Sequence, residues 1–406
     1  MLGAYVQRGG QIGGALGGVV RGMVGRRAAT SPVELHVLRS ECTDPSTNLA
    51  TEEWLQERAR GAGRVVHTLF LWRNRPTVVI GAHQNAAREC DLGAMRAAGV
   101  ALARRRTGGG AVYHDLANTN YTFVTAPARA YAAADAHAVT VDALRRAFGL
   151  RAAASGRNDI CVATPAGPRK VSGCAFRRRA NAVLHHGTML LDTDLAALGR
   201  LLTPAPAKLR AKGVASVRAR VANVSALVGR RATHAELCAA FEEAFVAHHT
   251  ARDTAHGAPR DVRVRVATLD APALLRRDRT LRRMRDALAS YDWRFGHDPA
   301  WGVRLEARRP WGTADLRLDV VRGRIAHAAL FTDCLNTAVA RTAADALRGC
   351  RYTRRDVVAA VDRAAADAVR AARRRRLRAP EALPEALEAQ EYLRDFAIWV
   401  ASNANV

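Results

Sequence analysis

The sequence lacks the features of membrane proteins and of cysteine-rich zinc or redox proteins. It has no run of about 18 uncharged apolar residues, the length that spans a bilayer, because its longest candidate, Gly9 to Val20, is short and half glycine. The seven cysteines are an odd number, widely scattered, and none forms a C-x-x-C pair. We therefore exclude a membrane span and expect reduced thiols in a reducing compartment.

Lysine and aromatic residues are also scarce. Only Lys170, Lys208 and Lys212 are lysines, so the net charge of +26 comes almost entirely from arginine, and aromatic residues make up 5% of the chain. A strongly basic surface can bind nucleic acid by releasing phosphate counterions, but no aromatic-interleaved basic stripe or finger motif accompanies this charge. We expect no nucleic-acid partner and interpret the charge as a compositional bias, which could still attract an acidic protein.

The chain as a whole has the composition of a folded protein. Apolar residues make up 49% and charged residues 25% of its 406 residues, which excludes disorder of the whole chain. This length exceeds what one compact core accommodates, so we expect two domains. The pattern of elements places them at residues 34–278 and 279–406.

The N-terminal segment differs from the rest. Its first 33 residues contain no Asp or Glu, and four arginines are spread among Gly, Ala and Val. An acid-free N-terminus with scattered arginines is typical of an organelle presequence, and the alternative is an N-terminus with no targeting role. We interpret residues 1–33 as a mitochondrial presequence, which predicts that the protein acts in the mitochondrial matrix.

Short apolar runs after this segment predict a mixed α/β domain. Runs bounded by Gly, Pro or Asn predict strands, and the Ala- and Arg-rich stretches between them predict helices. The expected strands are Leu69–Trp72, Thr77–Ile80, Ala111–Tyr113, Asn120–Val124 and Ile160–Val162, and the expected helices are Glu89–Ala98 and Ala134–Phe148.

Beyond residue 278 the pattern changes. We expect a helix over Leu281–Ser290 and then a hairpin whose turn is Arg322-Gly323. The run Arg373–Arg376, followed by two prolines, predicts a solvated loop before a last helix, Leu387–Val400.

Residues suited to chemistry gather first in the segment RRRTGGGAVYHD, Arg104–Asp115. Three successive glycines let the backbone approach a ligand without a Cβ, so adjacent amides can bind an anion, and flanking arginines can contact phosphate or carboxylate. The segment is neither a Walker A loop, since no G-K-[ST] follows, nor G-x-G-x-x-G, since Tyr113 stands at the last glycine. Taken alone, the triplet is equally consistent with a turn between strands.

The second such region runs from Gly156 to Leu191 and contains GRNDICV, RKVSGCAFR and HHGTMLL. A cation at Lys170 can neutralise the charge that develops when a carboxylate attacks phosphorus, and the alternative is a solvated surface lysine. Asp159 beside Asn158 offers hard oxygen ligands for a nucleotide-bound Mg²⁺, and its alternative is a turn residue.

Two neighbouring histidines, His185 and His186, also lie in this region. Each is interpreted as a base, a ligand or a hydrogen-bonded core residue, and the last is the commoner role of histidines before an apolar strand.

These segments keep a recognisable order from residue 34 to the C-terminus. The order is NLATEEWL, PTVVIGAHQN, RRRTGGGAVYHDLANTNYTF, GRNDI, KVSGCAFR, HHGTMLL, KGVASVRARVANV, DWRFGHDPAW, LRLDVVRGRIAHAALFTDCL and LRGCRYTRRDV. In this order they closely resemble lipoate-protein ligases of the bacterial type.

The resemblance implies a large catalytic domain of the biotin/lipoate ligase type, which is class II synthetase-like with mixed β-sheets and helices, and a small α/β accessory domain. It implies an ATP-dependent, AMP-forming reaction in which lipoate and ATP give lipoyl-adenylate and pyrophosphate, with Mg²⁺ accompanying ATP. A lysine of an acceptor then takes the lipoyl group. The implied acceptors are lipoyl domains of 2-oxoacid dehydrogenase acyltransferase subunits and the glycine cleavage H protein.

The resemblance also implies roles for individual residues. Lys170 takes the catalytic position that contacts both lipoate and nucleotide. The binding positions are Arg105, Gly110, Ala111, Val112 and Tyr113 for ATP, Thr107, Gly108 and Gly109 in the ligand loop, and Asn158 and Asp159 in the second region. The sequence departs from the family at Thr107 and Cys174, where serine is usual, and at Ala117, where glycine is usual.

Three other functions remain open. Octanoyltransferases of the same superfamily carry the acyl group on a thiol, which Cys174 could supply, although no histidine neighbours it in sequence. A lipoyltransferase would accept only preformed lipoyl-adenylate; the FGHDPAW and LFTDCL motifs and the C-terminal helix favour the full ligase. The third is a non-catalytic RNA- or protein-binding adaptor built on the basic surface.

Overall fold

The computed structural model describes residues 33–59, 64–156, 158–202, 221–254, 262–296, 301–334, 336–375 and 382–404. The expected presequence, apart from Val33, lies outside these residues, as does most of KGVASVRARVANV. Contacts within the chain divide the described residues into two compact units, and neither is one continuous segment. The first takes its residues from 33–79, 105–199 and 206–288, and the second from 80–104, 200–205 and 289–404.

A mixed eight-stranded sheet forms the centre of the first unit. Its order is β11-β1-β2-β6-β10-β9-β8-β7, with β1 parallel to both of its neighbours and the other pairs antiparallel. The strands are β1 (Val33–Ser40), β2 (Val65–Trp72), β6 (Asn118–Ala126), β7 (Ala152–Ser155), β8 (Asp159–Val162), β9 (Arg169–Arg178), β10 (Val183–Leu190) and β11 (Val262–Leu269).

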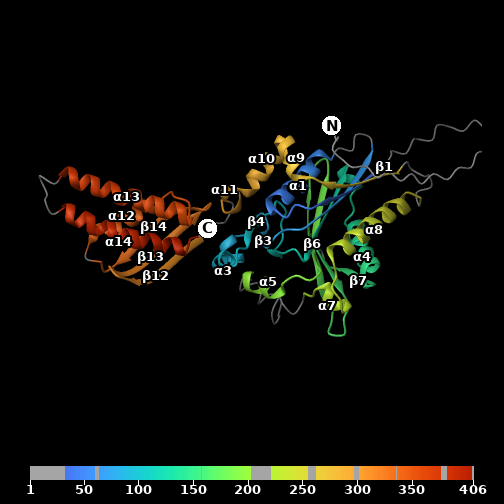
Figure 1. Ribbon diagram of the computed structural model, residues 1–406, viewed down its shortest axis with the longest axis horizontal. Coiled ribbons are helices and arrows are strands. Elements are labelled where there is room, and N and C mark those ends of the chain that lie inside the picture. The colour runs from blue at the N-terminus through green and yellow to red at the C-terminus, as the bar shows by residue number, and fades with distance from the viewer. Residues whose placement is uncertain are drawn as a thin grey trace, which may run out of the picture. The chain divides into compact units, whose positions relative to one another are not determined.

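Helices cover both faces of this sheet, with α1 on one side and α4 and α8 together on the other (Figure 1). They are α1 (Pro45–Arg58), the 3₁₀ turn η1 (Ala128–Ala130), α4 (Ala133–Phe148), α5 (Leu195–Leu201), α7 (Val224–Val228), α8 (His234–Thr254), α9 (Ala271–Arg277) and α10 (Arg279–Ala289). Two short strands, β3 (Thr77–Ile80) and β5 (Val112–His114), pair antiparallel beside the large sheet.

Local sequence explains where α1 begins. Asp44 caps the helix, because its side chain accepts a hydrogen bond from the Thr47 backbone N–H, and Pro45 occupies the first turn, where no N–H is needed. On the opposite side of the sheet, Phe123 of β6 packs against Phe241 and Phe245 of α8. The main apolar core therefore lies between the sheet and α4 and α8. On the other face α1 presents buried polar side chains such as Glu52, and its Leu55 packs against a small apolar cluster that contains Val124 and Leu184.

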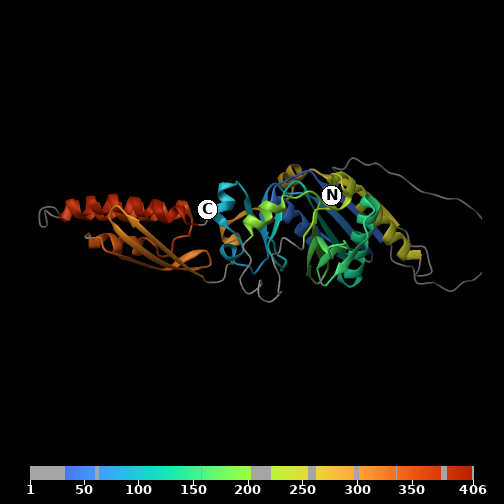
Figure 2. The ribbon, with the colours of Figure 1, turned by 90° about the horizontal axis from the view of Figure 1, so that it is seen from below.

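The second unit contains an antiparallel sheet in the order β12-β13-β14, with long helices layered on one side of it (Figure 2). Leu316, Leu318 and Val320 alternate with exposed residues along β13 and are buried, as half-buried strands require. The elements are α2 (Ala86–Glu89), α3 (Leu92–Ala97), β4 (Ala101–Arg104), α11 (Tyr291–Arg294), β12 (Trp301–Arg309), β13 (Gly312–Val321), β14 (Arg324–Thr332), α12 (Thr337–Leu347), α13 (Arg354–Arg375) and α14 (Ala382–Ser402).

The structure confirms some expected elements and corrects others. The hairpin turn is confirmed, since Arg322 and Gly323 both have positive φ, 52° and 73°, as a tight two-residue turn requires. The single helix over Glu89–Ala98 is wrong, because α2 ends at Glu89 and the side chain of Asp91 caps the start of α3.

The expected loop before the last helix is also wrong. The arginine run continues α13 to Arg375, and α14 begins at Ala382, so that Pro384 lies in its first turn, where proline costs no hydrogen bond. Residues 376–381 lie outside the described residues.

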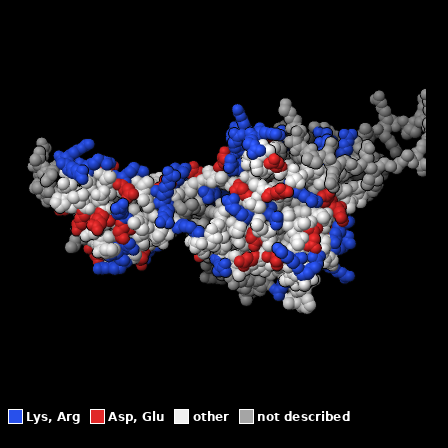
Figure 3. Space-filling model, viewed as in Figure 1, with Lys and Arg blue, Asp and Glu red and all other residues white. Residues whose placement is uncertain are grey.

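The charged residues form no single basic stripe on the face that Figure 3 shows, where Arg and Lys are interspersed with Asp and Glu. Among the described residues, none of the helices has both the length and the apolar character needed to cross a bilayer.

Gly187 of β10 provides a test of the packing. A Cβ there would overlap the ring and the hydroxyl of Tyr121, which is 1% exposed. We expect Gly187→Ala to lower the free energy of unfolding by about 1–3 kcal/mol, as overpacking does, measured by urea denaturation. Gly302→Ala is the control, because its Cβ would approach nothing closer than the Leu318 carbonyl at 3.9 Å. Equal losses in both variants would contradict this account.

Candidate active site

The glycine loop is built around the buried guanidinium of Arg105, which is 6% exposed. Its Nη2 donates to the carbonyl oxygens of Gly108 at 2.7 Å and Gly110 at 2.8 Å. Its Nη1 donates to the Val79 carbonyl at 3.0 Å, and its Nε donates to Thr107 Oγ1 at 3.0 Å. The loop therefore turns its carbonyls inward onto one cation, while its three glycines remain exposed.

Gly109 is the tightest point of this loop. Its φ of 94° is one that L side chains rarely adopt, and a Cβ there would lie 2.9 Å from Arg105 Nη2 and 3.9 Å from Ala175 Cβ. Ala175 belongs to β9, so the loop lies directly against that strand. This contact brings the two regions of the sequence together.

A buried chain of polar groups fixes the loop to α1. The carboxylate of Glu52 can only accept, so His186 Nδ1 donates to it at 2.9 Å, and Thr122 Oγ1 donates to it at 2.9 Å. The other ring nitrogen of His186 lies 2.8 Å from Thr107 Oγ1. Glu52, His186 and Thr107 are all buried, so each polar group depends on the others for its hydrogen bonds.

A second carboxylate of α1 binds two arginines near the loop. Glu53 lies 2.8 Å from Arg106 Nε and 3.9 Å from Arg177 Nη1. Burial raises the pKa of Glu53 to about 7, and the two guanidinium groups only partly oppose that rise. Glu53 therefore titrates close to neutral pH.

Lys170 and Asp159 form the second half of the site. Lys170 Nζ lies 2.7 Å from Asp159 Oδ1, and the two side chains are 34% and 41% exposed. The ammonium lies over Gly173 of β9, where a Cβ would meet it at 2.9 Å. Beside this pair the Asn158 carbonyl accepts from the Cys174 backbone N–H at 2.7 Å. Because Gly173 is only two residues from Ala175, one strand carries both the cation and the contact to the glycine loop.

The structure places the remaining expected residues near this loop. Val112 and Tyr113 lie in β5, opposite Val79 and Val78 of β3, and Tyr113 is 5% exposed, whereas Asn158 is exposed. All three arginines of the RRR run have protein partners: Arg104 donates to backbone carbonyls of its own unit, and Arg106 binds Glu53. A phosphate contact by Arg105 stays a prediction beside its role in shaping the loop.

Sequence reasoning missed two features. Glu52 was not singled out, although its motif NLATEEWL carried part of the resemblance, because nothing local links it to His186. The two histidines of β10 point to opposite faces, since side chains alternate along a strand. His186 belongs to the loop network, and His185 faces the side of the sheet on which α4 and α8 pack, 2.7 Å from the hydroxyl of Tyr131.

Cys174 shares the face of His185. Its Sγ lies 3.8 Å from His137 Nε2 of α4, a neighbour that the sequence did not reveal. Burial raises the pKa of Cys174 to about 11. A raised thiol pKa opposes a nucleophilic role.

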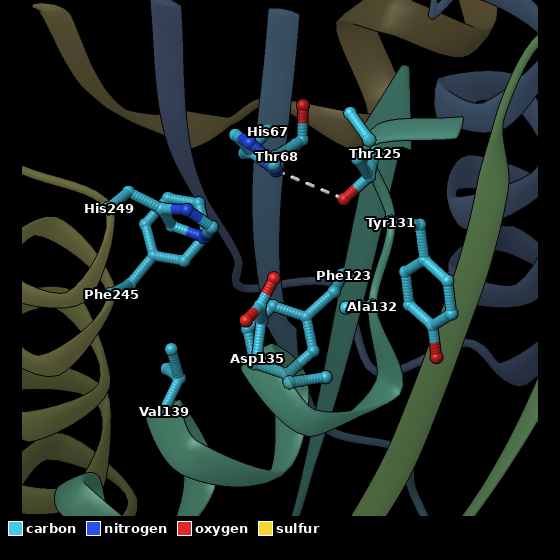
Figure 4. Close-up of a pocket in the computed structure, with 12 residues that line it drawn as sticks. His67, Thr68, Phe123, Thr125, Tyr131, Ala132, Asp135, Val139, Phe245 and His249 are labelled. Carbon is cyan, nitrogen blue, oxygen red and sulfur yellow. Dashed lines mark hydrogen bonds between the residues drawn. The ribbon is translucent and has the colours of Figure 1, made fainter. Parts of the chain in front are cut away.

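A separate small pocket opens on this same face (Figure 4). Phe123 and Tyr131 line it, and at its rim His67 Nδ1 lies 3.1 Å from Thr125 Oγ1. Neither Lys170 nor the glycine loop lines this pocket. The site that carries the expected chemistry is therefore the exposed loop with the Lys170 pair on the opposite face.

Comparisons with known proteins identify the family to which the chain belongs. Residues 44–246 match the model of the lipoyl protein ligase A/B catalytic domain, and residues 298–371 match the bacterial lipoate protein ligase C-terminus. The chain is 40% identical to lipoate-protein ligase A of Psychrobacter cryohalolentis over 332 residues, which cover 81% of this chain and 92% of that protein.

Solved structures show the same fold. The crystal structure of P. falciparum LipL1 in complex with lipoate has a TM-score of 0.52 at 24% identity, covering 80% of this chain and 93% of that one. A structure of a bipartite lipoate protein ligase from Thermoplasma acidophilum, studied with its E2 lipoyl domain, has a TM-score of 0.51 at 28% identity, covering 66% and 96%.

The fold and the matched catalytic domain define an enzyme of the lipoyl protein ligase class. The chain belongs to the lipoate-protein ligase family. This confirms the expected family, fold class and enzyme class.

Gly109 tests the ligand loop. A valine there would combine an unfavourable φ with a clash against Arg105, so lipoate and ATP binding should fall at least tenfold. Isothermal titration calorimetry measures both affinities. Gly93→Ala, a glycine whose φ is not positive and whose Cβ would lie 3.4 Å from the Asp91 side chain, is the control and should bind normally. Unchanged affinities for lipoate and ATP in Gly109→Val would show that the loop is an ordinary turn and does not bind these ligands.

Glu53 tests the electrostatics. Its folded-state pKa of about 7 lies above the ordinary 4.5, so the folded protein binds more protons than the unfolded chain between these values. Glu53 therefore raises the free energy of unfolding fully below pH 4.5, and this contribution is lost as the pH rises toward 7. Urea denaturation at pH 5 and pH 8 should show this loss, and Glu53→Gln should reduce the difference by roughly 2–3 kcal/mol. The control is Glu57→Gln, an exposed change on the same helix, which should leave the difference between pH 5 and pH 8 unaltered. If Glu53→Gln also leaves this difference unaltered, the raised pKa of Glu53 is wrong.

Proposed function

We propose that the chain is an ATP-dependent lipoate-protein ligase that makes lipoyl-adenylate and transfers the lipoyl group to lysines of lipoyl domains. The observation that carries this proposal is the position of Lys170, whose ammonium lies over Gly173 on the strand that contacts the glycine loop. The cation and the exposed loop thus face one region, as a site for a carboxylate and a polyphosphate requires.

The first step joins lipoate to the nucleotide. A carboxylate oxygen of lipoate forms a bond to the α-phosphorus of ATP, and the bond from that phosphorus to the bridging oxygen breaks, so that pyrophosphate leaves with the electron pair. Negative charge gathers on the phosphorus oxygens during this exchange. The ammonium of Lys170, kept in place by Asp159, stabilises that charge more than it stabilises the bound reactants.

The second step moves the lipoyl group to the acceptor. The uncharged amine of an acceptor lysine attacks the acyl carbon, the bond from that carbon to the AMP oxygen breaks, and the amine loses a proton as the amide forms. Lys170 can again stabilise the leaving phosphate. Asp159 supports this step indirectly, because its ion pair keeps the ammonium over Gly173.

Mg²⁺ fits the site as a nucleotide-bound ion. Asp159 supplies a carboxylate, but among the described residues it does not belong to a group of three candidate ligand side chains. Most of the oxygens around the ion would therefore come from phosphates and water, as is usual for Mg²⁺ with nucleotides. When bound, the ion neutralises phosphate charge.

The acceptors and the location extend the proposal. We infer that the acceptors are lipoyl domains of 2-oxoacid dehydrogenase acyltransferase subunits and the glycine cleavage H protein; an archaeal neighbour that was studied with its E2 lipoyl domain supports acceptors of this kind. The acid-free first 33 residues support a mitochondrial matrix location.

The decisive experiment is pyrophosphate release from the purified protein with lipoate and ATP and no acceptor. Release that depends on lipoate supports the full ligase. Absence of release, together with transfer from synthetic lipoyl-adenylate, would identify a lipoyltransferase and overturn the adenylation step.

Lys170 provides the residue-level test. We expect Lys170→Ala to lower the rate of lipoate-dependent pyrophosphate release roughly 100- to 1000-fold, because one charge-stabilising donor contributes about that much. The Kd for lipoate should change much less. Arg169→Ala removes a neighbouring cation from the same strand and should leave the rate nearly unchanged. A normal rate in Lys170→Ala would remove this residue from the mechanism.

A further inference from the structure

Three side chains that the proposed reaction does not use converge on the face of the large sheet opposite the Lys170 ammonium. They are His137 at the start of α4, Cys174 of β9 and His185 of β10, and their ligand atoms all lie within 4.8 Å of one another. The Cys174 Sγ to His137 Nε2 distance is 3.8 Å, and the two imidazole rings are 5.5 Å apart and almost perpendicular. Among the described residues no other group of three such side chains occurs.

The sheet explains why the cluster forms on this face. Cys174 pairs with Gly187 across β9 and β10, so Cys174 points to the same side as Gly187 and therefore as His185, two residues earlier. Lys170, in contrast, lies over Gly173, which faces the other side. The cluster is thus separate from the candidate active site.

His185 has the environment common for a histidine that binds a metal, in which one ring nitrogen is hydrogen-bonded and the other is free to bind. It is 1% exposed, and its Nδ1 lies 2.7 Å from the hydroxyl of Tyr131, which fixes the orientation of the ring. Its Nε2 is buried and has no hydrogen-bond partner within the described part of the chain. A buried ring nitrogen without a partner costs free energy unless something binds it.

We propose that His137, Cys174 and His185 bind one thiophilic divalent cation of the Zn²⁺ type. Two imidazole nitrogens and one thiolate suit such an ion, and a fourth position stays open for water. Tetrahedral coordination needs ligand atoms roughly 3.5 Å apart. The three ligand atoms lie within 4.8 Å of one another, and His137 is only half-buried.

Binding involves a balanced exchange of one proton for the metal. The imidazole of His185 offers the lone pair of its buried, unpartnered Nε2, and the thiol of Cys174 gives up its proton to become a thiolate ligand. The sulfur–metal bond forms as the S–H bond breaks, and the proton goes to solvent.

Co²⁺ titration of the purified full chain, followed by competition with Zn²⁺, tests this site. A thiolate bound to Co²⁺ gives a charge-transfer band in the near ultraviolet, and tetrahedral geometry gives intense visible bands. We expect both, saturating at about one ion per chain, with about one proton released and the bands lost when Zn²⁺ is added.

Variants assign the ligands. Cys174→Ser should abolish the charge-transfer band, and His137→Gln should weaken binding at least tenfold. Tyr131→Phe, which removes only the hydrogen bond to His185, should weaken it roughly tenfold. Cys161→Ser is the matched control, because Cys161 is a half-buried free thiol in the same sheet outside the cluster.

Circular dichroism of each metal-free variant verifies the fold. A full charge-transfer band in a folded Cys174→Ser variant, its loss in Cys161→Ser instead, or the absence of any band in the parent protein would each overturn the proposal. None of these readouts depends on ligase activity, so failure here and failure of the proposed function are distinguishable.

Discussion

The buried guanidinium of Arg105 is the interaction on which the candidate active site depends. A buried charge costs several kcal/mol unless it is fully hydrogen-bonded, and here the glycine loop itself provides three of the four acceptors. Burial lowers the pKa of Arg105 to about 10, which leaves it charged at neutral pH. The loop therefore has one favourable shape, because any other would leave this cation with too few partners.

The same cation connects the loop to the rest of the first unit. The Thr107 hydroxyl accepts a hydrogen bond from Arg105 Nε and is itself hydrogen-bonded to His186 Nε2. His186 Nδ1 in turn donates to Glu52 of α1. The network links helix, loop and strand on that face, beside a small apolar cluster in which Leu55 of α1 packs against Val124 and Leu184. This explains why α1 carries buried carboxylates, whereas α8, on the opposite face, packs through phenylalanine rings.

The large sheet separates two sets of chemistry. One face carries the glycine loop and the ammonium of Lys170, and the other carries the thiol and imidazole of Cys174 and His185. Adjacent residues in one strand thus serve different sites. The proposed ligase reaction uses the first face, and the proposed metal site concerns the second.

The sequence by itself determined the family, the fold class and most short strands, because these depend on composition and local pattern. It predicted ligand-binding roles for the glycine loop and for Lys170. It could not show that His185 and His186 face opposite sides of the sheet, that Glu52 binds His186, or that His137 lies beside Cys174. The last two contacts join residues 134 and 37 positions apart in the chain. It also predicted one helix over Glu89–Ala98, whereas α2 ends at Glu89 and α3 begins after the Asp91 cap. Only the tertiary structure decided these points, because strand pairing sets which face a side chain occupies and burial sets which polar groups must find partners.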